Sequence, residues 1–312
     1  MNLCDDICCF LTGKGVDCRL DDNGGQKVLY TGSSAAVIPV CVHAHSIKEA
    51  SEQAERLKQS INLHMDKTGE YPLVITEDRW LSQKSMMQAR LLAHLRIFTP
   101  IYARNCEIRK IDKLTAANFL NANHSYGDAR CRYRYGLYLK RHTGHNSGST
   151  EVTPGTLVAV AAFSNARRWI KADKIIRSYE WTRYASLPDV RLSGGMGKLL
   201  NAFIEDVHPD DIMTYADLEW SEGRVYEALG FVLEGFKEPV CFNVNASWRR
   251  SPVKPGMTET VKPGMTETVK KETPEAVKTG TSEVDGIAGS TDNLFFKNLG
   301  SNKYRLKLTD YQ

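Results

Sequence analysis

Hydrophobic and polar residues in the middle of the chain form short blocks that predict a mixed succession of strands and helices. The block Leu157–Phe163 is apolar throughout, which predicts a strand buried on both faces. Around residues 201–207, apolar positions recur every three or four residues, which predicts one face of a helix. Further strands are expected at Tyr133–Lys140, Arg177–Ala185, Ile212–Asp217 and Val240–Val244, and further helices at Leu114–Ala122 and Glu222–Leu229.

The first part of the chain shows a smaller set of α/β signals. Val37–Val42 and Leu73–Ile75 predict two short strands. Between them, Ser46 stands three residues before Glu49, which forms a capping box at the start of a helix. A second helix is expected from about Ser82. These elements predict a small α/β extension that precedes the main domain.

An octapeptide repeat interrupts this pattern further on. The sequence VKPGMTET begins at Val253 and again at Val261, and a diverged copy follows. Such residues bury too little apolar surface to offset their ordering entropy, so we expect Ser251–Asp292 to be a disordered linker. Alternation at Tyr304–Leu308 predicts a strand that either rejoins the main sheet or docks another molecule. The expected domains are an N-terminal α/β extension (1–110), a main domain (111–250), the linker (251–292) and a C-terminal β segment (293–312).

Composition narrows the class of protein. The chain has 312 residues, of which 42% are hydrophobic and 25% charged, and its net charge is +4. These values are ordinary for a soluble protein and exclude a collagen or a coiled coil. The longest apolar run, Leu157–Phe163, is far shorter than the roughly 20 residues of a membrane span. The start of the sequence lacks the pattern of a secretion signal, so we expect a cytoplasmic protein. Cys4, Cys8, Cys9 and Cys18 are irregularly spaced, so no metal site is expected.

A glycine-rich turn at 191–200 is the most informative stretch for chemistry. It joins a predicted strand to an amphipathic helix and reads RLSGGMGKLL. Glycines allow close approach of a ligand to the backbone, and the helix start offers free N–H groups. This combination is typical of a phosphate site. A tight turn that merely packs the helix on the sheet would give the same residues.

The elements around this turn resemble the GNAT acyltransferase superfamily. The order is strand, Arg-x-x-Gly-Gly loop, helix, strand, and then a helix with Tyr226 four residues before Gly230-Phe231. The resemblance covers roughly Leu114–Val244 and implies a mixed sheet flanked by helices. It also implies acyl-CoA as co-substrate and Tyr226 as the acid that protonates the departing thiolate. The residues it assigns to the pyrophosphate are Arg191, Gly194, Gly195, Gly197 and Lys198, with Met196 departing from the small residue expected at its position.

A narrower resemblance extends the similarity to about Leu73. Tyr215–Ser221, Glu77–Trp80 and Ile101–Cys106 are similar to segments of the GNAT-like module of phage and mobile-element proteins, some of which are described as homing endonucleases. A metal-dependent nuclease needs carboxylates that converge from several elements. Glu77 and Asp78 are adjacent, so on a strand they would point to opposite faces. We therefore expect them to cap or orient the helix from Ser82.

Candidate acid–base residues lie near predicted strand ends. An amine acceptor must lose a proton during acyl transfer, so a positioned base is expected. Glu180 lies on the strand before the glycine turn, and Asp217 ends the next strand. Alternatively, Glu180 pairs with Arg183 or with another basic neighbour. His124 could line the same site or be merely structural.

Basic residues interleaved with aromatic ones suggest nucleic acid as an alternative ligand. In Arg130–Tyr135, strand alternation would place Arg132 and Arg134 on one face and the tyrosines on the other. Arg167 and Arg168 add further charge. A solvated face over an aromatic core gives the same pattern, whereas phosphate backbones and exposed bases favour such residues.

The sequence thus predicts an α/β fold with a GNAT-like mixed β-sheet flanked by helices. The leading hypothesis for function is transfer of an acyl group from acyl-CoA to an unknown amine acceptor, with Glu180 or Asp217 as base and Tyr226 as acid. The alternative is a mobile-element protein that binds nucleic acid or modifies bases on the same fold. A third hypothesis is a degenerate GNAT-like module used as a binding scaffold.

Overall fold

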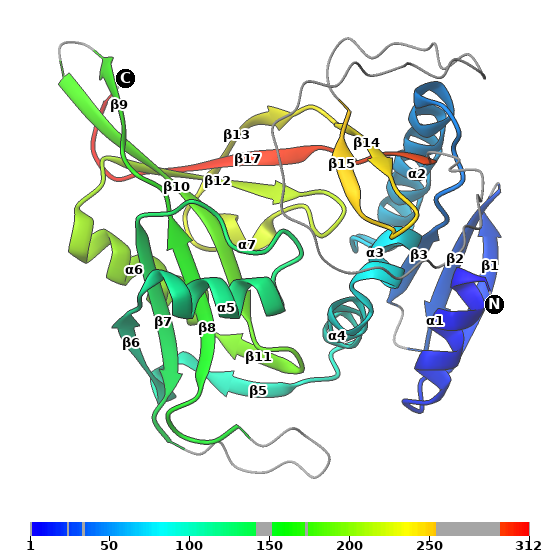
Figure 1. Cartoon of the computed structure of the whole chain (residues 1–312), viewed down its shortest axis with the longest axis horizontal. Coiled ribbons are helices and arrows are strands. Elements are labelled where there is room, and N and C mark those ends of the chain that lie inside the picture. Colours follow the sequence, from blue (N-terminus) through cyan, green and yellow to red (C-terminus); the bar gives the residue numbers. More distant parts are fainter. Residues whose placement is uncertain are drawn as a thin grey trace, which may run out of the picture.

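The computed structural model describes residues 2–23, 25–32, 35–141, 152–171, 174–253 and 294–311. Most of the predicted linker, at 254–293, lies outside the described residues. Helices and several sheets alternate along the chain, and the predicted mixed α/β class is confirmed (Figure 1). None of the helices in these ranges is long and apolar enough to cross a membrane.

The N-terminal part folds around a four-stranded sheet. Its strand order is β1 (Cys18–Asn23), β2 (Gln26–Thr31), β3 (Ala36–Val40) and β4 (Leu73–Thr76), and only β3 and β4 are parallel. Three helices, α1 (Leu3–Thr12), α3 (Glu77–Ser82) and α4 (Lys84–His94), supply residues to one hydrophobic cluster of this part, in which Trp80 is almost fully buried.

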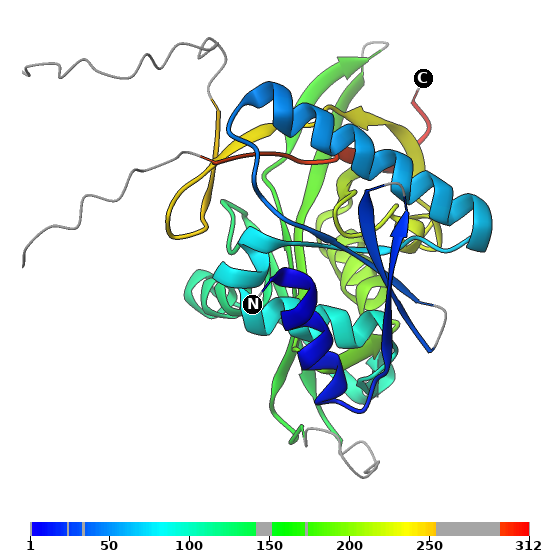
Figure 2. The same ribbon diagram turned by 90° about the vertical axis from the view of Figure 1, so that its right-hand side faces the viewer.

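Helix α2 (Ile47–Thr68) connects β3 to β4 and begins at the predicted cap. The Ser46 hydroxyl accepts the Glu49 amide at 3.1 Å, whereas the Glu49 carboxylate reaches back to the His45 amide at 2.9 Å. Leu57 and Ile61 of α2 pack into a cluster that includes residues of β3, β14 and β16. Figure 2 shows the helix passing beside the C-terminal strands. The apolar face of α2 therefore connects the N-terminal sheet to the C-terminal strands.

The larger sheet has eight strands in the described part of the chain. Seven follow one another in the order β13-β17-β12-β10-β8-β7-β6, and β9 (Arg167–Lys171) forms a hairpin with β10. Only the pair β10–β12 is parallel. The strands are β6 (Cys106–Lys110), β7 (Tyr133–Leu139), β8 (Leu157–Phe163), β10 (Lys174–Ser186), β12 (Asp211–Asp217), β13 (Val232–Lys237) and β17 (Ser301–Lys307).

Helices cover both faces of this sheet, and the alternation of side chains along β8 explains how. Ala161 and Phe163 share one cluster with α6 (Gly195–Val207), where the rings of Phe163 and Phe203 stack with centroids 3.9 Å apart. Val160 and Ala162 belong to the other cluster, with α5 (Lys113–Asn123). Every second residue of β8 thus faces a different helix, as a strand buried on both faces requires.

The segment that follows the repeat rejoins the fold. Strand β17 lies between β12 and β13, with seven residue pairs to β12. Before it, β16 (Leu294–Lys297) pairs with β14 (Cys241–Val244), which also pairs with β15 (Arg250–Pro252). A small parallel pair joins β5 (Thr99–Tyr102) to β11 (Val190–Ser193), and the turn η1 (Ala103–Asn105) follows β5. Helix α7 (Arg224–Glu227) is shorter than the helix predicted there.

Candidate active site

Strands β10 and β12 separate after a short stretch of pairing, and this separation creates the site. Their parallel register covers only Ser178–Glu180 with Asp211–Met213. Beyond this stretch, β10 continues to pair with β8, with a shift of register between Trp181 and Arg183. Strand β12 continues to pair with β17. The Thr214 hydroxyl bridges the two strands by donating to the Trp181 carbonyl at 3.0 Å. Ligands of α/β sheets gather where neighbouring parallel strands diverge.

A cavity of about 900 Å³ opens at this separation. Its lining comes from both separating strands, from the end of α5, from α4 of the N-terminal part, and from the segment that leads into β17. The predicted residues Glu180, Asp217 and Tyr226 all line it. The cavity lies within the usual size range of small-molecule sites.

The Glu180 carboxylate lines the cavity without an ion-pair partner among the described residues. Its backbone amide donates to the Ser164 hydroxyl oxygen at 2.9 Å, which fixes the backbone where the two strands separate. Within the described ranges, no ion pair joins its carboxylate to Arg183, whose guanidinium instead donates to the carbonyls of Gly127 and Thr182. The expected alternative, a Glu180–Arg183 pair, is therefore not formed in this structure.

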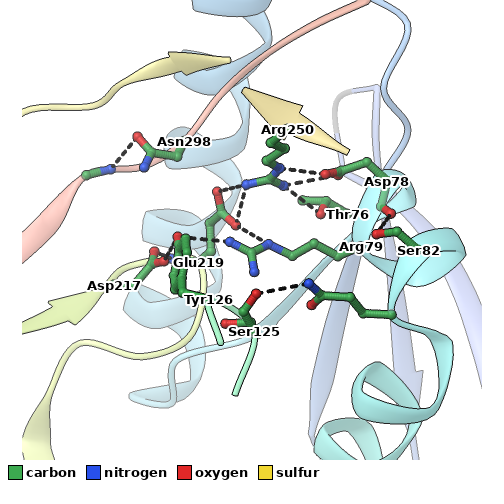
Figure 3. Close-up of polar contacts among 12 residues, drawn as sticks. Thr76, Asp78, Arg79, Ser82, Ser125, Tyr126, Asp217, Glu219, Arg250 and Asn298 are labelled. Carbon is green, nitrogen blue, oxygen red and sulfur yellow. Dashed lines mark hydrogen bonds and ion pairs between the residues drawn. The ribbon is translucent and has the colours of Figure 1, made fainter. Parts of the chain in front are cut away.

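Asp217 lies at the end of a buried ionic network (Figure 3). It accepts a hydrogen bond from the Tyr126 hydroxyl at 2.6 Å and another from the Glu219 amide at 3.0 Å. Arg79 donates to the Tyr126 oxygen at 2.9 Å and forms an ion pair with Glu219 at 3.1 Å. Burial raises the pKa of Tyr126, so its hydroxyl stays protonated and donates to the carboxylate.

Arg250 of β15 completes the network from the opposite side. It donates to both oxygens of Glu219, at 2.8 and 3.0 Å, and to both oxygens of Asp78, at 2.5 and 3.0 Å (Figure 3). Asp78 and Glu219 are 1% and 2% exposed. Glu77, beside Asp78, accepts the Val42 amide at 2.9 Å. Glu77 and Asp78 thus lie in the first turn of α3 rather than on a strand, and their hydrogen bonds connect α3 to the neighbouring segments.

Tyr226 lines the cavity with its phenol side chain. Its ring packs among aromatic residues that include Trp181, Phe231 and Tyr304. Burial raises the pKa of its hydroxyl, while Thr214 beside it acts in the opposite direction. The phenol therefore remains protonated near neutral pH.

His124 lines the cavity as a neutral imidazole. Burial, followed by the charges of Arg183, Arg90 and Arg79, lowers its pKa to about 4. Its Nδ1 accepts the Tyr126 amide at 3.1 Å. The proton of the neutral ring is thus on Nε2, and this assignment follows from the hydrogen bond.

The glycine-rich turn lies beside the cavity, and Met196 is the residue of it that lines the wall. Helix α6 begins at Gly195, preceded by Gly194 with φ 75°, and its first-turn amides lack partners inside the helix. A Cβ atom at Gly195 would lie 2.5 Å from the Leu192 side chain, so glycine is required there for packing.

Three other residues assigned to the pyrophosphate, Lys198, Arg191 and Gly197, do not line the cavity. Lys198 donates to the carbonyls of Ala103 and Cys106, at 2.9 and 2.6 Å, which fastens α6 to the β5–β6 connection. The exposed Arg191 lies 5.5 Å from the centroid of the Phe98 ring. Gly197 faces Leu229, since a Cβ atom there would lie 3.2 Å from that side chain.

The predicted basic face is divided between exposed and internal side chains. Arg130, Arg132, Arg167 and Arg168 are exposed. Arg134 is not accessible to a ligand from solvent, because its side chain is 8% exposed and donates to the carbonyls of Cys131 and Ala129. Arg132 and Arg134 therefore do not form one solvent-facing pair.

Comparisons with known proteins give little guidance. No protein-family model matches the chain, and no curated protein is significantly similar to it. Among solved structures, a mutant of the AtaT toxin bound to the C-terminus of the antitoxin AtaR and to acetyl-CoA matches at 14% identity with a TM-score of 0.27. The match covers 42% of this chain and 87% of that chain. A similarity of this size assigns neither fold nor activity, and none of these comparisons supports the mobile-element resemblance.

Sequence reasoning missed the contribution of the N-terminal part to the cavity. Arg90 of α4 lines the cavity, and Arg79 of α3 donates to Tyr126, a residue of the cavity wall in the turn after α5. The available signal was the run of Trp80, Met87 and Leu91, which marks the apolar side of these helices. It indicates which side is buried, but not that the polar side meets another sheet.

Proposed function

We propose that this chain transfers an acyl group from acyl-CoA to an amine. The observation that carries the proposal is the separation of β10 from β12 at a cavity whose lining includes the carboxylates of Glu180 and Asp217 and the protonated phenol of Tyr226. A single α/β opening thus offers a base, an acid and a neighbouring helix start. This is the combination that acyl transfer to nitrogen requires.

The roles follow from the contacts of each group. Acyl-CoA would supply an activated thioester carbonyl. Glu180, whose carboxylate has no ion-pair partner in the described ranges, would accept the proton that the attacking amine loses. Tyr226 would give its proton to the departing thiolate, so that one proton is taken up and one released. Asp217 is held by Tyr126 and is better placed to orient the amine than to accept its proton.

The first-turn amides of α6, beside Met196, are the proposed contact for the phosphates of acyl-CoA. The test is calorimetric titration of acetyl-CoA into the wild type, Met196→Glu and Met196→Gln. An acidic residue in the first turn is compatible with the helix dipole, so the glutamate variant should fold. We expect micromolar binding by the wild type, at least tenfold weaker binding by Met196→Glu, and little change for Met196→Gln.

The matched pair separates charge from size, because glutamate and glutamine differ mainly in the negative charge. Equal loss in both variants would indicate that Met196 matters only for packing. Absence of acetyl-CoA binding by the folded wild type would rule out acyl-CoA as the co-substrate.

A further inference from the structure

Arginines at the cavity and in the adjoining ionic network differ in whether they have ion-pair partners. Arg79 and Arg250 share the carboxylates of Asp78 and Glu219. Arg90 and Arg183 instead line the cavity itself. In the part of the chain that the structure describes, neither has a carboxylate within ion-pair distance. Buried charges in proteins are ordinarily paired, so these two guanidiniums call for an explanation.

Arg90 is the more unusual of the two. Its guanidinium stacks on the ring of Trp220, with its central carbon 3.5 Å from the ring centroid, and donates weakly to the Trp220 carbonyl at 3.4 Å. Its Nε is buried without a hydrogen-bond partner. Burial, followed by the charge of Arg79, lowers the pKa of Arg90. The stack holds the planar group in one orientation while most of its donors remain unused.

Arg183 and His124 extend this set of donors. Two hydrogen bonds to the Gly127 and Thr182 carbonyls, at 3.0 and 2.8 Å, fix the Arg183 guanidinium. His124 carries its proton on Nε2, because Nδ1 accepts the Tyr126 amide. Both residues line the same cavity as Arg90, and the charges of both arginines act on the imidazole. Three donors therefore surround one region of the cavity.

We propose that this region binds the anionic oxygen group of the acceptor, a small amine that also carries a carboxylate or phosphate. Arg90 and Arg183 hold the anion, and Asp217 and Glu180 lie on the cavity wall to receive the amine. The role of this ligand as acceptor rests on the proposed acyl transfer, whereas the anion site itself does not. An oxyanion matches the planar donors of arginine and provides these two guanidiniums with the ion-pair partner that they lack among the described residues.

Three probes with similar amines test this inference: O-phosphoethanolamine, β-alanine and ethanolamine. Each is titrated into the full chain without acetyl-CoA, and binding is followed by calorimetry. We expect the phosphate or the carboxylate probe to bind at least tenfold more tightly than ethanolamine. Arg90→Gln should reduce this preference to about twofold or less, and Arg90→Lys should keep part of it, because lysine retains the charge but not the planar fork.

Arg104→Gln is the matched control, because Arg104 is an exposed arginine whose guanidinium carbon lies 4.7 Å from the Tyr102 ring centroid. It should leave the preference unchanged. Thermal unfolding of Arg90→Gln should occur at the wild-type temperature or above, because an unpaired buried charge is removed. Equal binding of all three probes by the wild type would overturn the inference, as would a preference that survives Arg90→Gln.

Two further outcomes separate the sources of the anion. If Arg90→Gln weakens acetyl-CoA binding tenfold and leaves the probe preference intact, the arginines bind the co-substrate and the acceptor assignment is wrong. If a single-stranded oligonucleotide binds through Arg90 and the small amines do not, the ligand is nucleic acid and the assignment is also wrong. If acetyl-CoA does not bind but the probe preference holds, acyl transfer fails and the anion site stands.

Discussion

Tyr126 links Arg79 to Asp217, an acidic residue of the cavity wall, through one oxygen atom. It accepts from Arg79 at 2.9 Å and donates to Asp217 at 2.6 Å. Because the hydroxyl has one proton, the bond from Arg79 directs that proton toward the carboxylate. Arg79 is itself held by Glu219. The orientation of Asp217 is therefore set by Tyr126, from the turn after α5, and through it by Arg79 of α3.

His124 predicts a dependence of stability on pH. Its pKa is about 4 in the folded protein, against about 6.5 for an unfolded histidine. Between these values the unfolded chain binds more protons, so the contribution to stability is complete above pH 6.5 and is lost as the pH falls toward 4. We expect the free energy of unfolding, measured with urea, to change less steeply with pH between 4 and 6.5 for His124→Asn than for the wild type. An unchanged slope would contradict the neutral assignment.

The sequence could identify only part of the site. Glu180, Asp217 and Tyr226 were found because strand ends and the second helix are visible in the pattern, and all three line the cavity. Arg90 was not found, because its role depends on where α4 packs. That placement results from contacts between distant segments, such as the hydrogen bond from Tyr71 to the Leu218 carbonyl, and periodicity carries no information on them.

At the scale of elements, β17 is a late strand of the chain that lies inside the large sheet. It is inserted between β12 and β13, and Tyr304 and Arg305 are both buried. Arg305 donates to Asp211 at 2.5 Å and to Glu234 at 2.7 Å, which connects both neighbouring strands. Of the two expectations for this segment, the return to the main sheet is correct.

A nick in the repeat should therefore leave the protein assembled. A specific protease site in place of residues 261–268 would cut the chain between β15 and β16. We expect the two fragments to elute together in gel filtration, because β17 is paired on both edges. They should separate in denaturant. Fragments that separate under native conditions would indicate that these strand pairs do not hold the segment.

Elements with a strong local signal were predicted well, and the others were not. β8 has the expected bounds, and α5 differs by one residue at each end. The β1–β2 hairpin was missed because its residues carry charge and little apolar alternation. The predicted helix at 222–229 is reduced to α7, since Gly223 adopts φ 98° before it and the chain turns again at Gly230.

At the scale of the whole molecule, Arg250 joins three sheets. It lies on β15, its partner Asp78 follows the N-terminal sheet, and Glu219 follows β12 of the large sheet. Its side chain is 10% exposed, so the ion pairs are shielded from solvent. Removal of one partner leaves buried charges uncompensated, which is costly.

Arg250→Met is expected to lower the free energy of unfolding by about 3–5 kcal/mol. Arg249→Met is the control, because the neighbouring arginine is exposed. Urea unfolding followed by tryptophan fluorescence measures both. A loss of similar size in the two variants would mean that the network makes no special contribution, and the connection between the sheets would then have to come from apolar packing alone.

The late position of β17 in the chain has a consequence for biosynthesis. When the ribosome has made β12 and β13, the strand that belongs between them has not yet been translated. At roughly 5–20 residues per second, the nascent chain waits several seconds with two unpaired strand edges. Exposed edges are templates for pairing with other chains. The nascent protein is thus a natural client for chaperones that bind extended segments during this interval.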